Sequence, residues 1–235
     1  MSEIITAQPG TALASQAKLN ELQARLDGDV FTDQVRLLMY STDASDYRER
    51  PQAVVYPHHE NDIRELVRFA KETGVSLIPR TAGTSLAGQV VGNGIVVDVS
   101  QHMNQILEVN EEEKWVRVQP GVVLDELNIA LKSTGLFFSP ETSTSNRSMI
   151  GGMIGNNSCG LHSIVHGTTR EHTISVNAVL SDASLAQFKP LIPAELQEKL
   201  SLDNLEGSIY KRLFEILNDP GNQKEIVEHF PDPKV

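Results

Sequence analysis

The stretch SMIGGMIGNNSCGLHSIVHG (148–167) contains five glycines, two adjacent asparagines and two histidines, and it carries no charged side chain. Glycine lacks a Cβ atom, so its backbone N–H group can approach a ligand closely and its φ angle can be positive. The stretch therefore predicts a glycine-rich loop whose main chain, rather than its charges, contacts a ligand.

A second glycine-rich loop, PRTAGTSLAGQVVGNG (79–94), directly follows an expected strand. Thr81, Thr84 and Ser85 add hydroxyl groups, and Arg80 is its only full positive charge. Successive N–H groups in such a turn form a concave anion site. Together the two loops predict a site for the pyrophosphate of a dinucleotide.

The segments around the second loop alternate between strand and helix patterns. AVVYP (53–57), VSLIP (75–79) and GIVVDV (94–99) are β-branched runs, which predict strands. A helix is expected between the first two, with Asn61 as its N-cap and Gly74 at its end. This order predicts a small, mainly parallel sheet.

From residue 105 the strand pattern changes. Residues 105–121 read as two strands joined by an acidic turn, which predicts an antiparallel hairpin, and an amphipathic helix follows and ends at Gly135. Residues 172–188 predict a further strand pair with its turn at 182–184.

The two ends of the chain predict helices. Residues 12–26 have the apolar spacing of an amphipathic helix, and 34–51 read as a linker. From Pro193 two or three short helices are expected, interrupted by Asp-Pro-Gly at 219–221.

Composition excludes several classes of protein. The chain has 235 residues, a formal net charge of −11 and 5% aromatic residues, which disfavours nucleic-acid and anionic-membrane surfaces. Its start lacks the pattern of a signal peptide, and no apolar run reaches the roughly 18 residues of a membrane span, so we expect a cytoplasmic protein without a transmembrane segment. A single cysteine, Cys159, rules out an intramolecular disulfide and any multi-cysteine zinc or iron–sulfur site within this chain.

Three nucleotide or catalytic motifs are incomplete. GTSLAGQ (83–89) has the glycine spacing of a P-loop, but Gln89 stands where lysine must reach the phosphates. Gly92 and Gly94 lack the third glycine of a Rossmann fingerprint and precede a strand. Ser85 sits in a sequence like a nucleophile elbow, but no helix pattern follows it.

A metal site in the first stretch is also disfavoured. Cys159, His162, His166 and His172 have the chemistry of metal ligands, but their spacing matches no zinc motif. A lone cysteine is commonly a small buried apolar residue. We therefore expect no metal here.

Five segments in order carry a resemblance to a known family. They are RTAGTSLAG (80–88), VQPGV (118–122), SPETST (139–144), IGGMIGNNSCG (150–160) and HG (166–167). The chain resembles the FAD-binding (PCMH-type) domain of the vanillyl-alcohol oxidase and p-cresol methylhydroxylase superfamily from about Arg48 to about Ser184. Within it, FAD-linked 2-hydroxyacid dehydrogenases of the D-lactate, glycolate and D-2-hydroxyglutarate type are the most similar.

The resemblance implies an α+β fold of two α/β subdomains, with FAD between them. The first would hold the small, mainly parallel sheet and the second a larger antiparallel or mixed sheet. The expected domains are a helical lead-in (1–47), the FAD-binding domain (48–190, with subdomains of about 48–104 and 105–190) and a helical extension (191–235). A substrate-binding cap domain would then follow outside this chain.

The resemblance also implies the cofactor and its contacts. Some members attach FAD covalently through a histidine in the first loop, where this chain has Thr84, so non-covalent FAD is expected. The implied cofactor-binding residues are Arg80, Thr81, Ala82, Gly83, Thr84, Ser85, Pro140, Glu141, Thr142, Gly151, Gly152, Gly155, Asn156, Asn157, Gly160 and Gly167. Alternatively, Asn156 and Asn157 could serve only a turn with left-handed geometry, and Gly151 and Gly152 could be helix-packing glycines.

The implied reaction is oxidation of a 2-hydroxyacid to a 2-oxoacid with hydride transfer to FAD. The hydroxyacid would bind through the cap domain, and an iron–sulfur electron acceptor would lie elsewhere in the full-length protein. No catalytic base is assigned; His162 and His166 are nearest in sequence to the expected flavin end. A non-catalytic flavin or nucleotide-binding module and an NADPH-dependent UDP-sugar enol-ether reductase remain as alternatives.

Overall fold

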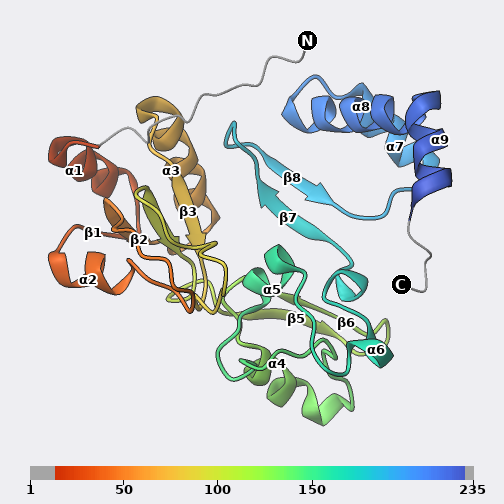
Figure 1. Cartoon of the computed structure of the whole chain (residues 1–235), viewed down its shortest axis with the longest axis horizontal. Helices are drawn as coiled ribbons and strands as arrows, with labels where there is room; N and C mark the ends of the chain where they lie inside the picture. The colour runs from red at the N-terminus through yellow and green to blue at the C-terminus, as the bar shows by residue number, and fades with distance from the viewer. Residues whose placement is uncertain (1–13, 231–235) are drawn as a thin grey trace. The chain divides into compact units, whose positions relative to one another are not determined.

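The computed structural model describes residues 14–230, which form two compact units, 14–174 and 175–230. Figure 1 labels their helices and strands. The units divide after Ile174, and the domain borders expected from the sequence stay predictions.

The first unit contains a four-stranded sheet in the order β1-β2-β4-β3. β2, β4 and β3 are parallel, so the predicted mainly parallel sheet is confirmed, and β1 pairs antiparallel with β2 at one edge. The sequence reading missed β1. The strands are β1 (Asp29–Phe31), β2 (Ala53–Tyr56), β3 (Leu77–Arg80) and β4 (Ile95–Asp98).

Helices cover both faces of this sheet because side chains of consecutive strand residues point to opposite faces. Val55 and Val97 face α1 (Gln16–Arg25) and α3 (Glu60–Thr73) in one buried cluster. Val54 and Val96 pack with Leu37 of α2 (Gln34–Met39) in another. The predicted lead-in helix is thus confirmed within the described residues.

Two local predictions in this region were wrong. Residues 34–51 were expected to be a linker, but burial of Leu37 stabilises α2 there, and Thr42 pairs with Arg48 in an isolated β-bridge. The N-cap of α3 is His59 rather than Asn61, because the buried Asp62 carboxylate accepts the His58 N–H group and fixes the turn before the helix. Gly74 ends α3 with a φ of 73°, as predicted.

The second core of this unit lies between a hairpin and two helices. β5 (Ile106–Asn110) and β6 (Trp115–Val118) pair antiparallel, which confirms the predicted hairpin. α4 (Leu124–Leu131) continues as a 3₁₀ turn (Lys132–Thr134) and ends at Gly135, whose φ is 72°. The buried residues of this second core are Val122, Leu124, Leu127, Leu131, Ile150 and Met153. Against them pack the partly buried Ile106, Val116, Val118 and Phe138.

The stretch 148–167 is not the continuous loop that the sequence predicted. It contains α5 (Ile150–Asn156) and the short helix α6 (Ser163–His166), and a 3₁₀ turn (Arg170–His172) follows it. Glycine is a poor helix former, but burial of Ile150 and Met153 against α4 outweighs its propensity. The glycines of this stretch are therefore partly helix-packing residues.

The second unit contains a hairpin and three helices. β7 (Val176–Val179) and β8 (Leu185–Phe188) pair antiparallel around the predicted turn, where Asp182 Oδ1 accepts the Ser184 N–H group. Helices α7 (Pro193–Ser201), α8 (Leu205–Asn218) and α9 (Pro220–His229) follow, as predicted. The antiparallel strands thus form two separate two-stranded sheets rather than one larger sheet.

Candidate cofactor-binding site

The loop after β3 offers a row of main-chain donors. Among the described residues, the N–H groups of Thr81 through Ser85 meet no hydrogen-bond acceptor, and all five residues are half-buried. Gly83 has a φ of 68°, which L-residues with side chains rarely adopt. Consecutive N–H groups around such a residue form an anion-binding concavity.

The segment before β2 supports this loop. Arg80 donates from Nη1 to the Thr42 carbonyl at 2.9 Å, and its guanidinium lies 5.0 Å from the centre of the Tyr40 ring. The Ala44 N–H group donates to the Gly83 carbonyl at 3.1 Å. Arg80 therefore fixes the loop to residues 40–44. These residues belong to the segment predicted to be a linker.

A buried hydrogen-bond network lies at the ends of the central strands. The Tyr40 hydroxyl contacts Asp98 Oδ2 at 2.5 Å and the Tyr56 hydroxyl at 3.0 Å, and Asp98 is 3% exposed. Burial, together with the bond to Asp98, raises the pKa of Tyr40. Asp98 pairs with Arg80 in the strand register, so the network lies beside the loop. The only sequence signal for it is an acidic residue that ends an apolar strand.

Helix α5 brings the two glycine-rich segments together. A Cβ atom at Gly152 would lie 2.4 Å from Thr81 Oγ1, so α5 packs directly on the first loop. At Gly151 a Cβ would lie 2.5 Å from Pro120 Cβ, and the Gly151 N–H group donates to the Pro120 carbonyl at 2.8 Å. Gly151 is thus a packing residue, whereas Gly152 faces the loop.

The end of α5 is more open. A Cβ at Gly155 would meet nothing within 4 Å, and Asn156 is exposed. Asn157 adopts the left-handed conformation, and its Oδ1 accepts hydrogen bonds from Thr168 Oγ1 and the Arg170 N–H group, both at 2.9 Å. The side chain of Asn157 therefore holds the following turn.

The SPETST segment contacts the end of the 148–167 stretch. Glu141 accepts the His162 N–H group at 3.2 Å and lies 2.9 Å from His162 Nδ1, and these hydrogen bonds lower the pKa of Glu141. A Cβ at Gly160 would lie 2.5 Å from the Glu141 carbonyl oxygen, so only glycine fits there. Pro140 is buried, and Thr142 Oγ1 lies 2.9 Å from Ser148 Oγ.

The Glu171 carboxylate stabilises the turn at Gly167. Gly167 has a φ of 78°, and Glu171 accepts the Thr168 N–H group at 2.6 Å. The hydrogen bond from the Thr168 hydroxyl and this main-chain bond lower the pKa of Glu171 to about 2. Glu171 therefore fixes Thr168 and the exit from Gly167.

The histidines of this region have separate partners. His172 Nε2 lies 2.6 Å from the His166 carbonyl and 3.1 Å from Ser139 Oγ, while His162 pairs with Glu141. Cys159 is exposed. His162 and His166 border a depression of about 220 Å³, which is lined by Leu124, Asp125, Asn128, Phe137, Phe138, Ser139, Pro140, Glu141, Ser145, His162 and His166.

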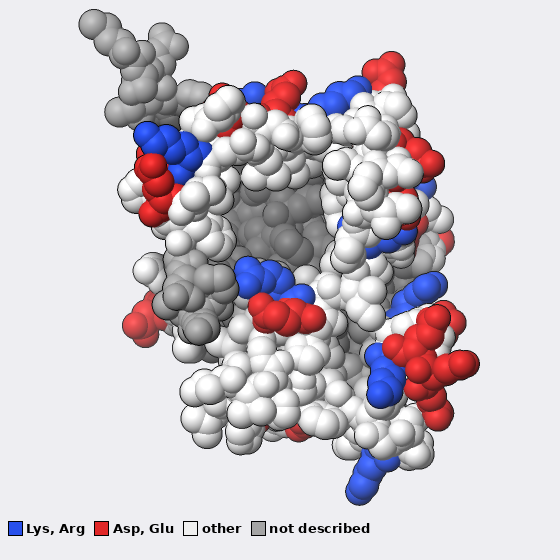
Figure 2. All heavy atoms as spheres, turned by 90° about the vertical axis from the view of Figure 1, so that its right-hand side faces the viewer, with Lys and Arg blue, Asp and Glu red and all other residues white. Residues whose placement is uncertain are grey.

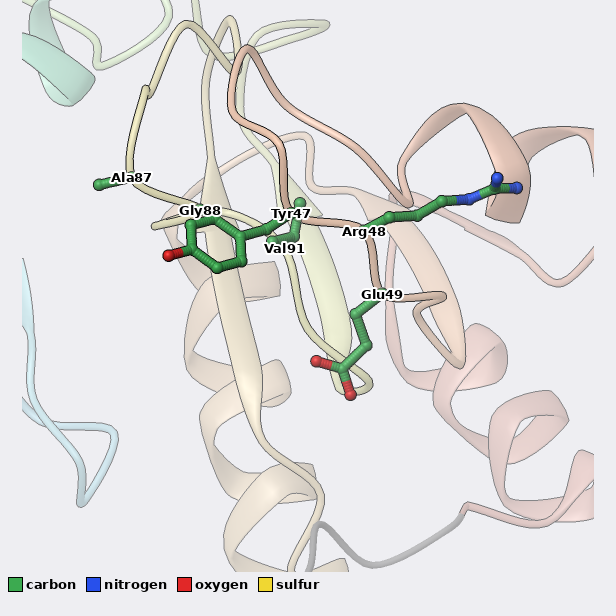
Figure 3. Close-up of a pocket in the computed structure, with 6 residues that line it drawn as sticks. All are labelled: Tyr47, Arg48, Glu49, Ala87, Gly88 and Val91. Atoms are coloured by element: carbon green, nitrogen blue, oxygen red, sulfur yellow. The ribbon is translucent and has the colours of Figure 1, made fainter.

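A second depression lies against the far part of the first loop. It has a volume of about 320 Å³ and is lined by Tyr47, Arg48, Glu49, Ala87, Gly88 and Val91, which Figure 3 labels. Gly88 has a φ of 70°, and a Cβ there would lie 2.7 Å from the Tyr47 ring. The chain at 47–49 thus supports this end of the loop too.

Uncharged residues make up most of the face that Figure 2 draws. The charged side chains among its described atoms lie in small groups of both signs. Within residues 14–230, no helix has the length and apolar character needed to cross a membrane. The candidate site offers mainly main-chain and hydroxyl donors at residues 81–85, which fit a pyrophosphate and its sugar chain.

Comparison with known proteins agrees with this geometry. The family described as FAD binding domain matches residues 51–189, which is more than half of the chain. The D-2-hydroxyglutarate dehydrogenase of Escherichia coli (strain K12) is 41% identical over 232 residues, which cover 97% of this chain and 22% of that protein. The glycolate oxidase subunit GlcD of Bacillus subtilis (strain 168) is 38% identical over 150 residues, 63% of this chain and 32% of that one.

Solved structures share the fold at lower identity. The crystal structure of p-cresol methylhydroxylase with substrate bound matches with a TM-score of 0.65 and 16% identity, over 74% of this chain and 36% of that one. The present chain spans 22% of the length of the D-2-hydroxyglutarate dehydrogenases of Escherichia coli and Pantoea ananatis and 49% of that of Stutzerimonas stutzeri. The chain belongs to the FAD binding domain family, has the PCMH-type fold, and takes FAD as its cofactor.

Proposed function

We propose that this chain is the FAD-binding part of a dehydrogenase or oxidase that converts a 2-hydroxyacid to the 2-oxoacid. The row of free N–H groups from Thr81 to Ser85 is the observation that carries the FAD site. The names of the relatives, which are D-2-hydroxyglutarate dehydrogenases and a glycolate oxidase subunit, support the substrate class. These substrates share a hydroxyl group on the carbon next to a carboxylate.

In this proposal the FAD pyrophosphate lies against the first loop. The main chain at 81–85 would donate to it, and Gly152, which packs on Thr81, would allow its close approach. Gly151 packs against Pro120 rather than contacting FAD. The Asn157 side chain stabilises the turn at 168–170. The remaining proposed contacts are Arg80, Pro140, Glu141, Thr142, Gly155, Asn156, Gly160 and Gly167.

The flavin, when bound, supplies the acceptor for the hydride of the substrate. The residues of this chain bind and orient it, and Arg80 holds the loop rather than pointing a charge at the substrate. His162 and His166 border the depression beside the SPETST segment. We assign neither as the catalytic base, because His162 pairs with Glu141 and the His166 ring packs edge-on against Phe137 with their centres 5.9 Å apart.

Further parts of the reaction belong outside this chain in the proposal. The chain spans 22% of the Escherichia coli and 32% of the Bacillus subtilis relative, which leaves room for a cap domain that holds the hydroxyacid. One cysteine cannot hold an iron–sulfur cluster, so such an electron acceptor would also lie elsewhere. Non-covalent attachment of FAD and a cytoplasmic location stay predictions.

The test is anaerobic bleaching of the bound flavin in the intact protein that carries this chain. D-2-Hydroxyglutarate, D-lactate and glycolate would be mixed with the protein separately, and NADPH would be tested beside them. We expect one or more hydroxyacids to reduce the flavin while NADPH does not. If NADPH reduced the flavin and no hydroxyacid did, this proposal would be wrong and an enol-ether reductase would be favoured.

A further inference from the structure

A cluster of two histidines and an aspartate lies away from the proposed cofactor contacts. Asp29 begins β1, His58 follows β2, and His102 lies in the turn after β4. One ligand atom of each side chain lies within 4.8 Å of the others, and all three residues are exposed. Residues far apart in the sequence thus meet at one end of the sheet, where β1 begins and β2 and β4 end.

The side chains of this cluster are available for a ligand. The imidazole rings of His58 and His102 lie edge to face with their centres 4.2 Å apart. Among the described residues, neither ring and no Asp29 carboxylate oxygen makes a hydrogen bond or an ion pair. Two imidazole rings beside this carboxylate offer nitrogen and oxygen donors to a cation.

The backbone fixes the positions of the three residues. Asp29 pairs with Tyr56 in the β1–β2 register, and the His58 N–H group donates to the buried Asp62 carboxylate at 2.8 Å. The turn that carries His102 is closed by a bond from the Met103 N–H group to the Val99 carbonyl. The side chains can therefore adjust while their Cα atoms remain in place.

We propose that Asp29, His58 and His102 bind one divalent transition-metal cation of the Zn²⁺ class. Imidazole and carboxylate groups suit Zn²⁺ and Co²⁺, and small side-chain rotations would bring the donor atoms to the roughly 2.0–2.2 Å bonds that Zn²⁺ forms. Water would complete the coordination of such an exposed site. The cation would link edge strand β1 to the turns that follow β2 and β4, and so would stabilise this end of the sheet.

A neighbouring group of Asp27, His59 and Asp62 is a weaker candidate. The Asp62 carboxylate is buried and already accepts N–H groups from Asp27, Gly28 and His58. His59 Nε2 pairs with Asp27 at 2.9 Å, and its Nδ1 accepts the Asp62 N–H group. These bonds account for the group as the N-terminal support of α3, and a cation would have to displace them.

The test is calorimetric titration of the untagged chain with Zn²⁺, with thermal unfolding as a second readout. We expect one equivalent to bind and the unfolding midpoint to rise. His58→Gln and His102→Gln should each weaken binding at least tenfold and remove the rise. His59→Gln and His229→Gln, at exposed histidines outside the cluster, should keep both.

Three outcomes would overturn the proposal. The wild-type chain could bind no Zn²⁺, or His59→Gln could abolish binding while His58→Gln keeps it, or all four variants could bind like the wild type. Because the three ligands are exposed, their variants should fold, and Trp115 fluorescence checks this. Asp29→Asn, which removes the charge but keeps the shape, should also weaken binding.

Discussion

Alanine at Gly151 and at Gly155 should have opposite effects on stability, although both residues belong to α5. A Cβ at Gly151 would lie 2.5 Å from Pro120 Cβ and 3.0 Å from the Pro120 Cα and carbonyl oxygen. A proline fixed in the main chain cannot move aside, so overpacking should cost about 1–3 kcal/mol. The higher helix propensity of alanine stabilises α5 by only about 0.5–1 kcal/mol relative to glycine.

At Gly155 the same change meets nothing within 4 Å. Gly155→Ala should therefore raise the free energy of unfolding by about 0.5–1 kcal/mol, and the two variants should differ by about 1–3 kcal/mol. Urea unfolding of the chain without FAD, followed by the fluorescence of its single tryptophan, Trp115, measures this in the first unit. A Gly151→Ala variant as stable as Gly155→Ala would refute the packing role of Gly151.

The same pair separates packing from cofactor contact. If FAD approaches Gly155 as we propose, Gly155→Ala should weaken FAD binding while it stabilises the chain. FAD affinity is measured by titration of flavin fluorescence. Unchanged affinity would remove Gly155 from the proposed contacts but leave the first loop in place.

Two further predictions rest on hydrogen bonds, and a third rests on the expected non-covalent attachment of FAD. Tyr40→Phe should destabilise the chain by about 1–3 kcal/mol in urea unfolding, because the buried Asp98 loses a donor, whereas Tyr47→Phe, at an exposed side chain, should stay within about 0.5 kcal/mol. The hydrogen bond to Asp27 raises the pKa of His59 from 6.5, so this pair stabilises the fold fully below about pH 6.5 and the effect is lost as the pH rises through the raised value. His59→Gln should therefore lower the unfolding midpoint more at acidic than at alkaline pH, because the bond from the Asp62 N–H group to His59 Nδ1 is lost at both; an equal loss at both would contradict this. Acid precipitation of the FAD-loaded chain should leave the flavin in the supernatant, and flavin in the pellet would show covalent attachment.

Much of the fold could be predicted from local patterns. The β-branched runs at 53–57 and 94–99 became central strands because burial on both faces needs continuous apolar side chains. Gly74 and Gly135 ended helices in the left-handed conformation, as their positions indicated. These features depend on neighbouring residues alone.

Features set by tertiary contacts were missed. α5 forms although three of its seven residues are glycine, because Ile150 and Met153 are buried against α4. α2 and edge strand β1 likewise depend on packing against distant residues. The sequence pattern therefore could not distinguish a glycine-rich loop from a glycine-rich helix.

The proposed site was only partly visible in the sequence. The glycine loops marked the main-chain donors, but nothing local indicated that Arg80 would reach Thr42 or that Asp98 and Tyr40 would form a buried pair. Glu141 and His162 are 21 residues apart, and only the fold brings them together. Support for a site comes from such distant pairs, and a single sequence carries little record of them.

The most direct test of the central claim is FAD retention by the chain and by matched glycine variants. The protein is loaded with FAD and desalted, and its visible spectrum is recorded for the wild type, Gly152→Asp, Gly152→Asn and Gly135→Asp. Gly135 is left-handed with no atom near its Cβ position, and aspartate tolerates that conformation, so the last variant carries the same added charge elsewhere.

We expect flavin bands for the wild type and Gly135→Asp and loss of flavin in Gly152→Asp, with Gly152→Asn retaining more flavin than the aspartate variant. Trp115 fluorescence confirms that each protein is folded. A folded wild-type chain that takes up no FAD, or a Gly152→Asp variant that retains it fully, would contradict the placement of the pyrophosphate against Thr81 to Ser85.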